Sequence, residues 1–241
     1  MAYRIQRMRM HLLMGLVFLP APLRAQAGVP VHEEPRHHLV LDRGWLRVLD
    51  VQIQPGDTTL FHTHATPIHY VVIGASRTNS QVLGGPWPAP SSATVARNPG
   101  QAFWTLEYAG QPVTHRVTNV GDGLFRLIAV TNEGPGIDDA AMSARLAGDT
   151  LPGAVEAESR WYRRTRLTLA PGAGTPLLSG AGPVLVVQVA PGITEWTSPE
   201  VRDVRMMNTP GEWVLHEAGR RYTLRNAGSG AVTLVMVQIL R

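Results

Sequence analysis

The sequence contains neither cysteine nor lysine among its 241 residues. Without cysteine there can be no disulfide bond, no thiolate nucleophile and no thiolate metal ligand. Without lysine, covalent catalysis through a side-chain Schiff base is excluded. Any bound metal must therefore be held by imidazoles or oxygen donors, and a folded chain must be stabilised by its core.

Long apolar runs are also missing beyond the first part of the chain, so no later segment is long enough to cross a bilayer. The 24 glycines and 19 prolines are scattered along the sequence, which favours many short strands and turns over long helices. The hydrophobic fraction of 44% is ordinary for a globular protein, and the length allows two small domains.

The N-terminal segment has a composition of its own. Arg4, Arg7 and Arg9 precede a short apolar run over residues 12–23, and Ala25-Gln26-Ala27 follows. A basic region, an apolar region and an A-x-A site predict a signal peptide, residues 1–27, and a periplasmic or secreted protein. An uncleaved membrane anchor is the alternative, and the short, proline-interrupted run disfavours it.

The charge balance changes once this segment is removed. Subtracting its four arginines from the 22 basic residues leaves 18, which equals the 18 acidic residues. No basic stripe remains to suggest nucleic-acid binding. We expect a small-molecule substrate or ligand as partner, no nucleic acid, no membrane contact after cleavage, and a monomer or homodimer.

Two blocks of the remaining sequence recur in the same order. Residues 45–56 match residues 161–172 at an offset of 116, and residues 115–123 match residues 222–230 at an offset of 107. Apolar and polar residues alternate within the first block of each copy, a period typical of half-buried strands. The sequence therefore predicts an internal duplication.

The segment between the copies has a different pattern. Gly134-Pro135-Gly136 interrupts the strand pattern, and residues 137–146 contain helix formers with Asp138 and Asp139 near their start. We predict a linker with one short helix. The expected organisation is an N-terminal unit over 28–132, the linker over 133–160 and a C-terminal unit over 161–241.

Three histidines fall at chemically informative positions. His62 and His64 share one face of a strand and lie about 7 Å apart along it. Ala65-Thr66-Pro67 then breaks the strand, because proline cannot continue a ladder. We expect His69 to return on the next strand and face the same point, either as a ligand or as part of the pocket lining. Three converging imidazoles would suit a divalent metal.

This spacing resembles the first motif of the cupin superfamily, which runs Gly, five residues, His-x-His, three or four residues, Glu, and a later Gly. Gly56, His62 and His64 fit this motif, and His69 stands at the Glu position. The closing Gly comes slightly early, at Gly74.

The second cupin motif, Gly, His, three residues, Asn, is matched by Gly110, His115 and Asn119, with two extra residues after Gly110. The resemblance implies an all-β chain of two double-stranded β-helix (jelly-roll) barrels joined by a short linker with one helix. It implies one metal in the first barrel, held by His62, His64, His69 and His115.

Replacement of the motif's Glu by His69 would make the ligand set neutral. Imidazoles suit iron, zinc, nickel and copper, whereas carboxylates favour manganese. We therefore expect a divalent metal, with Fe(II) favoured and Zn, Ni or Cu possible. Within the superfamily that the sequence resembles, some dioxygenases similar to acetylacetone-cleaving enzymes use three histidines, so an all-imidazole site is compatible with oxygen chemistry.

Three functions remain open from the sequence. The first is a metal-dependent, dioxygenase-like enzyme acting on a small organic molecule, whose catalytic residues the sequence does not identify. The second is a non-catalytic cupin that binds a small ligand or metal outside the cytoplasm. The third is metal-free ligand binding. Fold cannot choose between them, because cupins host enzymes and binders alike.

The second copy has lost the ligands. His62, His64 and His69 correspond to Leu178, Gly180 and Leu185 at the first offset, and His115 corresponds to Tyr222 at the second offset. We expect this degenerate barrel to support the first by packing.

Several other polar residues have ordinary interpretations. Asn119 is expected to form a turn, and Tyr70 to point away from the cavity. Glu107 and Tyr108 are weaker candidates for an acid–base group. The N-terminal arm, with His32, Glu33, Glu34, His37 and His38, is expected to pack as a polar segment across a barrel edge, with a second, surface metal site as the alternative.

Overall fold

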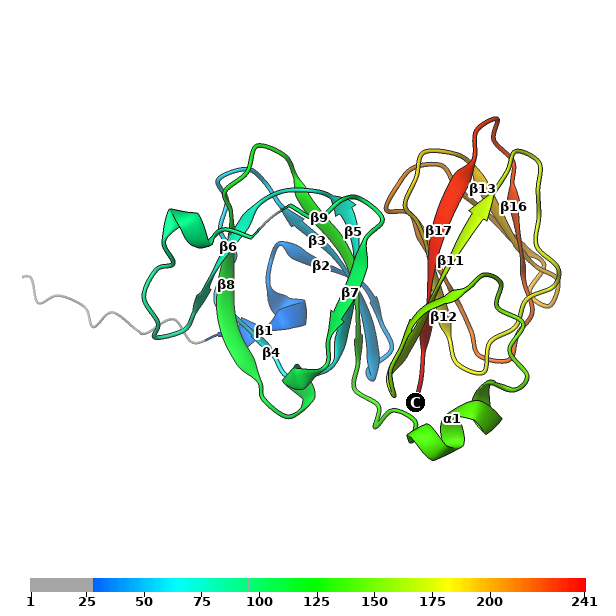
Figure 1. Cartoon of the computed structure of the whole chain (residues 1–241), viewed down its shortest axis with the longest axis horizontal. Coiled ribbons are helices and arrows are strands. Elements are labelled where there is room, and N and C mark those ends of the chain that lie inside the picture. The colour runs from blue at the N-terminus through cyan, green and yellow to red at the C-terminus, as the bar shows by residue number, and fades with distance from the viewer. Residues whose placement is uncertain (1–27, 95) are drawn as a thin grey trace, which may run out of the picture.

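The computed structural model describes residues 28–94 and 96–241, and its regular secondary structure is mostly β-strand, arranged in two barrel-like halves (Figure 1). The predicted signal peptide lies outside the described residues. Within them, no helix has the length and apolar character needed to cross a membrane.

The first half forms two sheets that face each other. One sheet has the order β1-β4-β8-β6 and the other the order β2-β3-β9-β5-β7. The strands are β1 (Val29–Pro30), β2 (His37–Asp42), β3 (Leu46–Ile53), β4 (His62–His64), β5 (Ile68–Gly74), β6 (Thr78–Val82), β7 (Ala102–Thr105), β8 (Val113–Asn119) and β9 (Phe125–Asn132). Short 3-10 helices cover Val31–Glu33, Pro90–Ser92 and Glu107–Ala109.

The second half repeats this plan with one sheet reduced. Its larger sheet has the order β10-β11-β17-β12-β15 and its smaller sheet the order β14-β13-β16. The elements are α1 (Asp139–Leu146), β10 (Val155–Glu158), β11 (Tyr162–Leu169), β12 (Val184–Gln188), β13 (Thr194–Ser198), β14 (Asp203–Met207), β15 (Trp213–His216), β16 (Thr223–Asn226) and β17 (Val232–Ile239).

Strand register confirms the duplication. Leu46 pairs with Asn132 in the β3–β9 ladder, and Tyr162 pairs with Ile239 in the β11–β17 ladder. These partners are related by the offsets of 116 and 107 found in the sequence. A shift of one residue would have moved every side chain to the opposite face, so the two copies have kept the same inward and outward faces.

The segment between the copies contains the predicted helix, α1, which starts at Asp139. The same segment also holds a strand that the sequence did not indicate, since β10 pairs antiparallel with β11. This pairing repeats that of β2 with β3 in the first half. Part of the expected linker is therefore the edge strand of the second barrel's larger sheet.

Asn119 and its twin Asn226 close equivalent turns. The Asn119 amide donates to the backbone carbonyls of Ile53 and Gly123, at 2.8 and 2.7 Å. The Asn226 amide donates to the equivalent carbonyls, at 2.9 and 2.8 Å. Both side chains are fully buried. The conformational role expected for Asn119 is thus confirmed by its copy in the barrel that lacks ligands.

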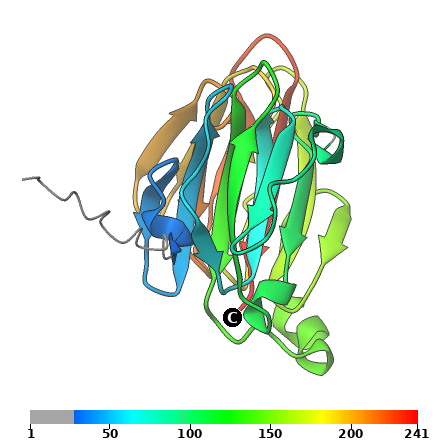
Figure 2. The same cartoon turned by 90° about the vertical axis from the view of Figure 1, so that its left-hand side faces the viewer.

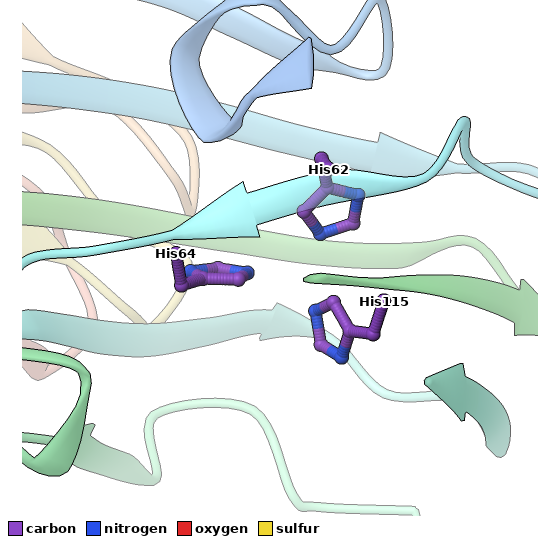
Figure 3. A group of neighbouring side chains, drawn as sticks. All are labelled: His62, His64 and His115. Atoms are coloured by element: carbon purple, nitrogen blue, oxygen red, sulfur yellow. The ribbon is translucent and has the colours of Figure 1, made fainter. Parts of the chain in front are cut away.

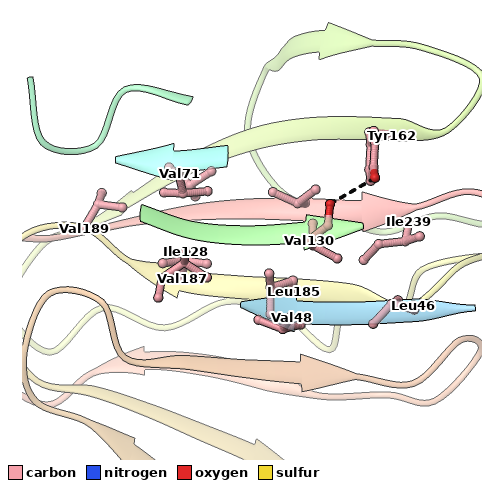
Figure 4. Close-up of a cluster of buried hydrophobic side chains, with 12 residues drawn as sticks. Leu46, Val48, Val71, Ile128, Val130, Tyr162, Leu185, Val187, Val189 and Ile239 are labelled. Atoms are coloured by element: carbon pink, nitrogen blue, oxygen red, sulfur yellow. Dashed lines mark hydrogen bonds between the residues drawn. The ribbon is translucent and has the colours of Figure 1, made fainter. Parts of the chain in front are cut away.

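The larger sheets of the two halves pack against each other through an apolar cluster (Figure 4). Viewed from the side of the first barrel, the long strands of the two halves run in nearly the same direction (Figure 2). The cluster includes Val71 and Val130 from the first barrel and Leu185 and Val237 from the second. At its edge, the Tyr162 hydroxyl donates to the carbonyl oxygen of Pro67 or Val130, at 2.8 and 3.0 Å. Each fully buried side chain of this size contributes about 1.5–3 kcal/mol, so the interface holds the two barrels together.

Candidate metal centre

Three imidazoles meet inside the first barrel, on strands β4 and β8 (Figure 3). One nitrogen from each of His62, His64 and His115 lies within 4.8 Å of the other two. His62 pairs directly with His115 across the ladder, so these side chains share a face, and His64 is two residues further along the same face. The structure thus brings together three of the four histidines proposed from the sequence.

Hydrogen bonds orient these rings. The Nδ1 of His62 lies 3.0 Å from the carbonyl oxygen of Leu60, which can only accept, so Nδ1 carries the proton and Nε2 keeps its lone pair. The Nδ1 of His115 lies 2.9 Å from the Ser80 hydroxyl. Such contacts on the remote nitrogen are typical of metal-binding histidines.

Two ring nitrogens of the group are buried without a partner, Nε2 of His115 and Nδ1 of His64. Buried polar atoms nearly always have a hydrogen-bond partner, so two imidazole nitrogens without one need an explanation. A divalent metal between the rings would satisfy a lone pair on His115. The donor set therefore fits a metal with nitrogen ligands.

Burial also keeps the three rings in the form that binds metals. It lowers the pKa of His62, His64 and His115, in the last case to about 4, with a further lowering of the His64 and His115 values by neighbouring histidines. A neutral imidazole has a free lone pair and a protonated one has none. All three rings are therefore neutral and available at pH 7.

His69 does not join the group, contrary to the expectation from the motif. Its ring is fully buried on the opposite face of β5, with centroids 5.8 Å from the ring of Trp104 and 5.6 Å from that of Tyr162. Its Nε2 lies 3.4 Å from Nη1 of Arg164, in the second barrel. The reason is strand phase, because Ile68 and Tyr70, on either side of His69 in β5, face the cavity.

The second copy explains what His69 does. Its counterpart, Leu185, belongs to the apolar cluster between the barrels. The equivalent position therefore lies at the interface in both copies, filled by His69 in the first and by Leu185 in the second. The contacts of His69 with Trp104, Tyr162 and Arg164 help to join the barrels. With three rather than four residues after His64, the Glu position of the motif falls on Ile68, whose apolar side chain lines the cavity.

His37 is a residue of the centre that sequence reasoning missed. It was expected on a polar arm, yet it is buried, and its ring centroid lies 4.5 Å from that of His62. Its Nδ1 donates to the carbonyl oxygen of Val31 at 2.9 Å, and the ring lines the cavity. Burial, together with the nearby His62, lowers its pKa to about 3.

Alternation in the sequence could not have placed His37 on this face. A β-bulge between Leu39 and Leu41 shifts the register of β2, so the pattern of the strand does not report which face its first residue takes. Glu34 of the same arm is also buried, whereas His38 is exposed. Within the described residues, His62, His64 and His115 are the single group of side chains arranged to hold a metal.

A cavity of about 180 Å³ adjoins the imidazoles. Tyr108 stacks on His64, with centroids 4.7 Å apart and ring planes 27° apart, and it lines this cavity. Tyr70 lines it as well, which corrects the expectation that it points away. Glu107 is exposed and accepts a hydrogen bond from the backbone N–H of Leu106, at 3.0 Å, so it stands outside the cavity.

In the second barrel the equivalent space is filled. Leu178 and Tyr222 form the bridge that corresponds to the His62–His115 pair. Both side chains are buried in an apolar core cluster together with Trp196. The loss of ligands expected from the sequence is thus accompanied by packing of bulky side chains where the first barrel has its cavity.

Comparison with known proteins identifies the fold but not a close relative. No family model matches the sequence, and no curated protein matches it. Among solved structures, AerE from Microcystis aeruginosa covers 86% of this chain and 99% of its own, with a TM-score of 0.56 and 9% identity. A cupin 2 conserved barrel domain protein from Leptotrichia buccalis covers 83% and 86%, with a TM-score of 0.50 and 10% identity.

A salicylate 1,2-dioxygenase from Pseudaminobacter salicylatoxidans is also similar, covering 80% of this chain and 70% of its own, with a TM-score of 0.54 and 11% identity. At such low identities the likeness shows the fold alone. Together with the two motifs and the repeated register, it confirms that the chain has the cupin fold, built twice.

Proposed function

We propose that the protein is a metal-dependent cupin in which His62, His64 and His115 hold one divalent ion. Fe(II) is favoured, with Zn, Ni or Cu as alternatives, because a neutral imidazole set suits these ions. We further propose dioxygenase-like chemistry on a small organic molecule. The observation that carries the proposal is the meeting of three neutral imidazoles, two of them buried and that of His115 half-buried, beside a cavity.

The comparisons support the enzymatic hypothesis. The similar salicylate 1,2-dioxygenase shares the fold over most of this chain, and it has also been solved as an adduct with gentisate. Since a protein of the same fold binds a small organic molecule, we propose the cavity beside the imidazoles as the substrate site. The chemistry of this chain must still be argued from its own residues.

When bound, a metal would supply Lewis acidity and, for iron, redox chemistry. The protein's own groups orient the imidazole rings and cover them. The Leu60 carbonyl and the Ser80 hydroxyl fix two imidazoles, and Tyr108 packs on the third. The aliphatic and aromatic wall makes the surroundings of the imidazoles less polar, which strengthens electrostatic interactions inside the cavity.

A binding protein without catalysis is the second candidate. One observation favours it, since no carboxylate lines the cavity among the described residues, and proton transfer would be left to imidazole and hydroxyl groups. A ligand or metal carrier needs no such group, whereas many enzymes do.

We also propose that the protein is exported after cleavage behind Ala27. The mature chain would then begin at Gly28, directly before β1, which pairs in parallel with β4. Mass spectrometry of the N-terminus of protein recovered from the producing cells is expected to find Gly28. An intact leader would contradict the proposal.

Oxygen uptake separates the two candidate functions. Protein loaded with Fe(II) under anaerobic conditions is mixed with air-saturated buffer and a panel of phenols, catechols, diketones and their acids, with an oxygen electrode as readout. An enzyme is expected to consume oxygen with at least one compound, and His62→Ala should abolish this uptake. If the loaded protein retains iron but consumes no oxygen with any compound, the binding function stands instead.

A further inference from the structure

The wall of the metal-site cavity carries no charged side chain. Its polar groups are imidazoles and hydroxyls, and the rest is aliphatic or aromatic. The hydroxyl residues are Thr78, Ser80, Thr105, Tyr70 and Tyr108. Within the described lining there is no arginine that could pair with an acidic substrate. Arginine is the usual partner of a carboxylate, because its planar fork matches the two oxygens.

The charges behind the wall are net negative on the side of His37. Glu34 is buried, and its Oε2 lies 3.9 Å from Nε2 of His37. Arg36 is 3.5 Å from Glu34, but its guanidinium also forms a bidentate pair with Asp57, at 2.7 and 2.8 Å. One cation thus faces two carboxylates, so this group would repel an anion in the cavity rather than attract it.

The basic side chain of Arg97 is separated from the cavity-lining Tyr70 by an aromatic ring. The guanidinium carbon of Arg97 lies 3.7 Å from the ring centroid of Phe103. The ring of Tyr70 stacks on Phe103 at 4.8 Å and 25°. Two groups at these distances must occupy opposite faces of the Phe103 ring. Phe103 therefore stands between Arg97 and Tyr70, and Arg97 itself is exposed.

The size of the cavity limits what it can take. An apolar cavity of about 150 Å³ accommodates a benzene molecule in another protein. The cavity of about 180 Å³ found here would accept one ring with a few small substituents. The rings of Tyr70 and Tyr108 line the cavity, and each has one face covered, by Phe103 and His64 respectively. Their other faces favour a planar molecule, since aromatic rings stack in offset pairs.

We propose that this cavity selects an uncharged, planar molecule of single-ring size, whose oxygen atoms face the imidazole group and whose remaining surface is apolar. The proposal rests on the proposed function in that the imidazole group marks the reacting end. A carboxylate elsewhere on such a molecule would lose its water without gaining a cation, which disfavours its burial. The preference comes from the wall, so it does not require the metal.

A matched pair of probes tests this selectivity. 4-Methylcatechol and 3,4-dihydroxybenzoate have the same ring and the same two hydroxyls, and differ in a methyl against a carboxylate placed away from them. Their dissociation constants are measured anaerobically by calorimetry, with metal-free protein and with protein loaded with Zn²⁺, which has no redox chemistry. We expect 4-methylcatechol to bind at least tenfold more tightly in both forms.

Two variants locate the source of the preference. Arg97→Gln should leave the ratio of the two constants within twofold, because Phe103 keeps Arg97 out of the cavity. Phe103→Ala should lower the ratio by opening the wall toward Arg97. Equal or tighter binding of the acid by the wild-type protein, in either form, would overturn the proposal. A failure of Zn²⁺ to bind would count against the proposed function alone, since the metal-free comparison still measures the wall.

Discussion

Replacing His115 by alanine is expected to lower the affinity for Zn²⁺ at least 100-fold. His115 supplies one of three nitrogens that lie within 4.8 Å of one another, and its Nε2 has no other partner. Loss of a group that merely orients a ligand costs 10- to 100-fold in metal affinity, so loss of a ligand should cost more. Competition titration against a chromophoric chelator at pH 7.5 measures the change.

His69→Leu provides the matched control, because it places in the first barrel the residue that its counterpart, Leu185, has in the second. His69 faces the other barrel, so this variant should bind Zn²⁺ within about twofold of the wild-type protein. A large loss in His69→Leu with little change in His115→Ala would reverse the assignment made here and restore the original interpretation of the motif.

Acid is expected to destabilise the metal-free protein strongly. Burial lowers the pKa of His37 and His69 to about 3 and that of His115 to about 4, against an ordinary value of 6.5. At pH values between the lowered pKa of each histidine and its ordinary pKa of 6.5, the unfolded chain binds a proton that the folded chain does not. The free energy of unfolding therefore falls as the pH drops below 6.5, and the loss levels off only near pH 3–4.

The size of this effect follows from the three groups. Each loses about 1.4 kcal/mol per pH unit in this window, so the free energy of unfolding should be about 4 kcal/mol lower at pH 5.5 than at pH 7.5. Domains are stable by only about 5–15 kcal/mol, so the loss is a large share. Urea unfolding followed by tryptophan fluorescence, with a chelator present, measures it at both pH values.

The His69→Leu variant also serves as a control for this prediction. Removing one buried titrating group should reduce the difference between the two pH values by about 1.4 kcal/mol. An unchanged free energy of unfolding from pH 7.5 to pH 5.5 in the wild-type protein would show that these imidazoles are not held neutral by burial.

The sequence predicted the duplication because two blocks recur in the same order at similar offsets, 116 and 107, and the resemblance to the cupin motifs implied the barrel fold. Residues 45–56 and 115–123 recur in order, and register along the long ladders is preserved when one copy is placed on the other. His62 and His64 were predicted to share a face because side chains alternate along a strand, whereas His115 was predicted from the resemblance to the second cupin motif. Such information is local and survives in a single sequence.

The residues that were misplaced lie where local alternation stops. The strand pattern is interrupted at Pro67, between β4 and β5, so the pattern of β4 does not predict which residues of β5 face the cavity. His69 and Tyr70 therefore take the opposite faces from those expected. A bulge in β2 hid the inward position of His37. Both are tertiary outcomes, since the faces depend on which sheet packs against the second barrel and which encloses the cavity.

The second barrel contributes to the centre through packing. Its Tyr162 hydroxyl lies within hydrogen-bond distance of the Pro67 carbonyl, in the turn that separates His64 from β5. Its Arg164 approaches His69 on that strand. The degenerate copy thus holds the connection between the two strands that bear the motif, while bulky residues such as Tyr222 fill its own interior.

A crystal structure of the Zn²⁺-loaded protein, with anomalous diffraction data collected at the zinc edge, tests the central claim most directly. We predict a single strong peak inside the first barrel, about 2.0–2.1 Å from one nitrogen each of His62, His64 and His115, with His69 still facing the second barrel. A peak on the surface arm at His32 or His38, or none in the barrel at saturating zinc, would contradict it.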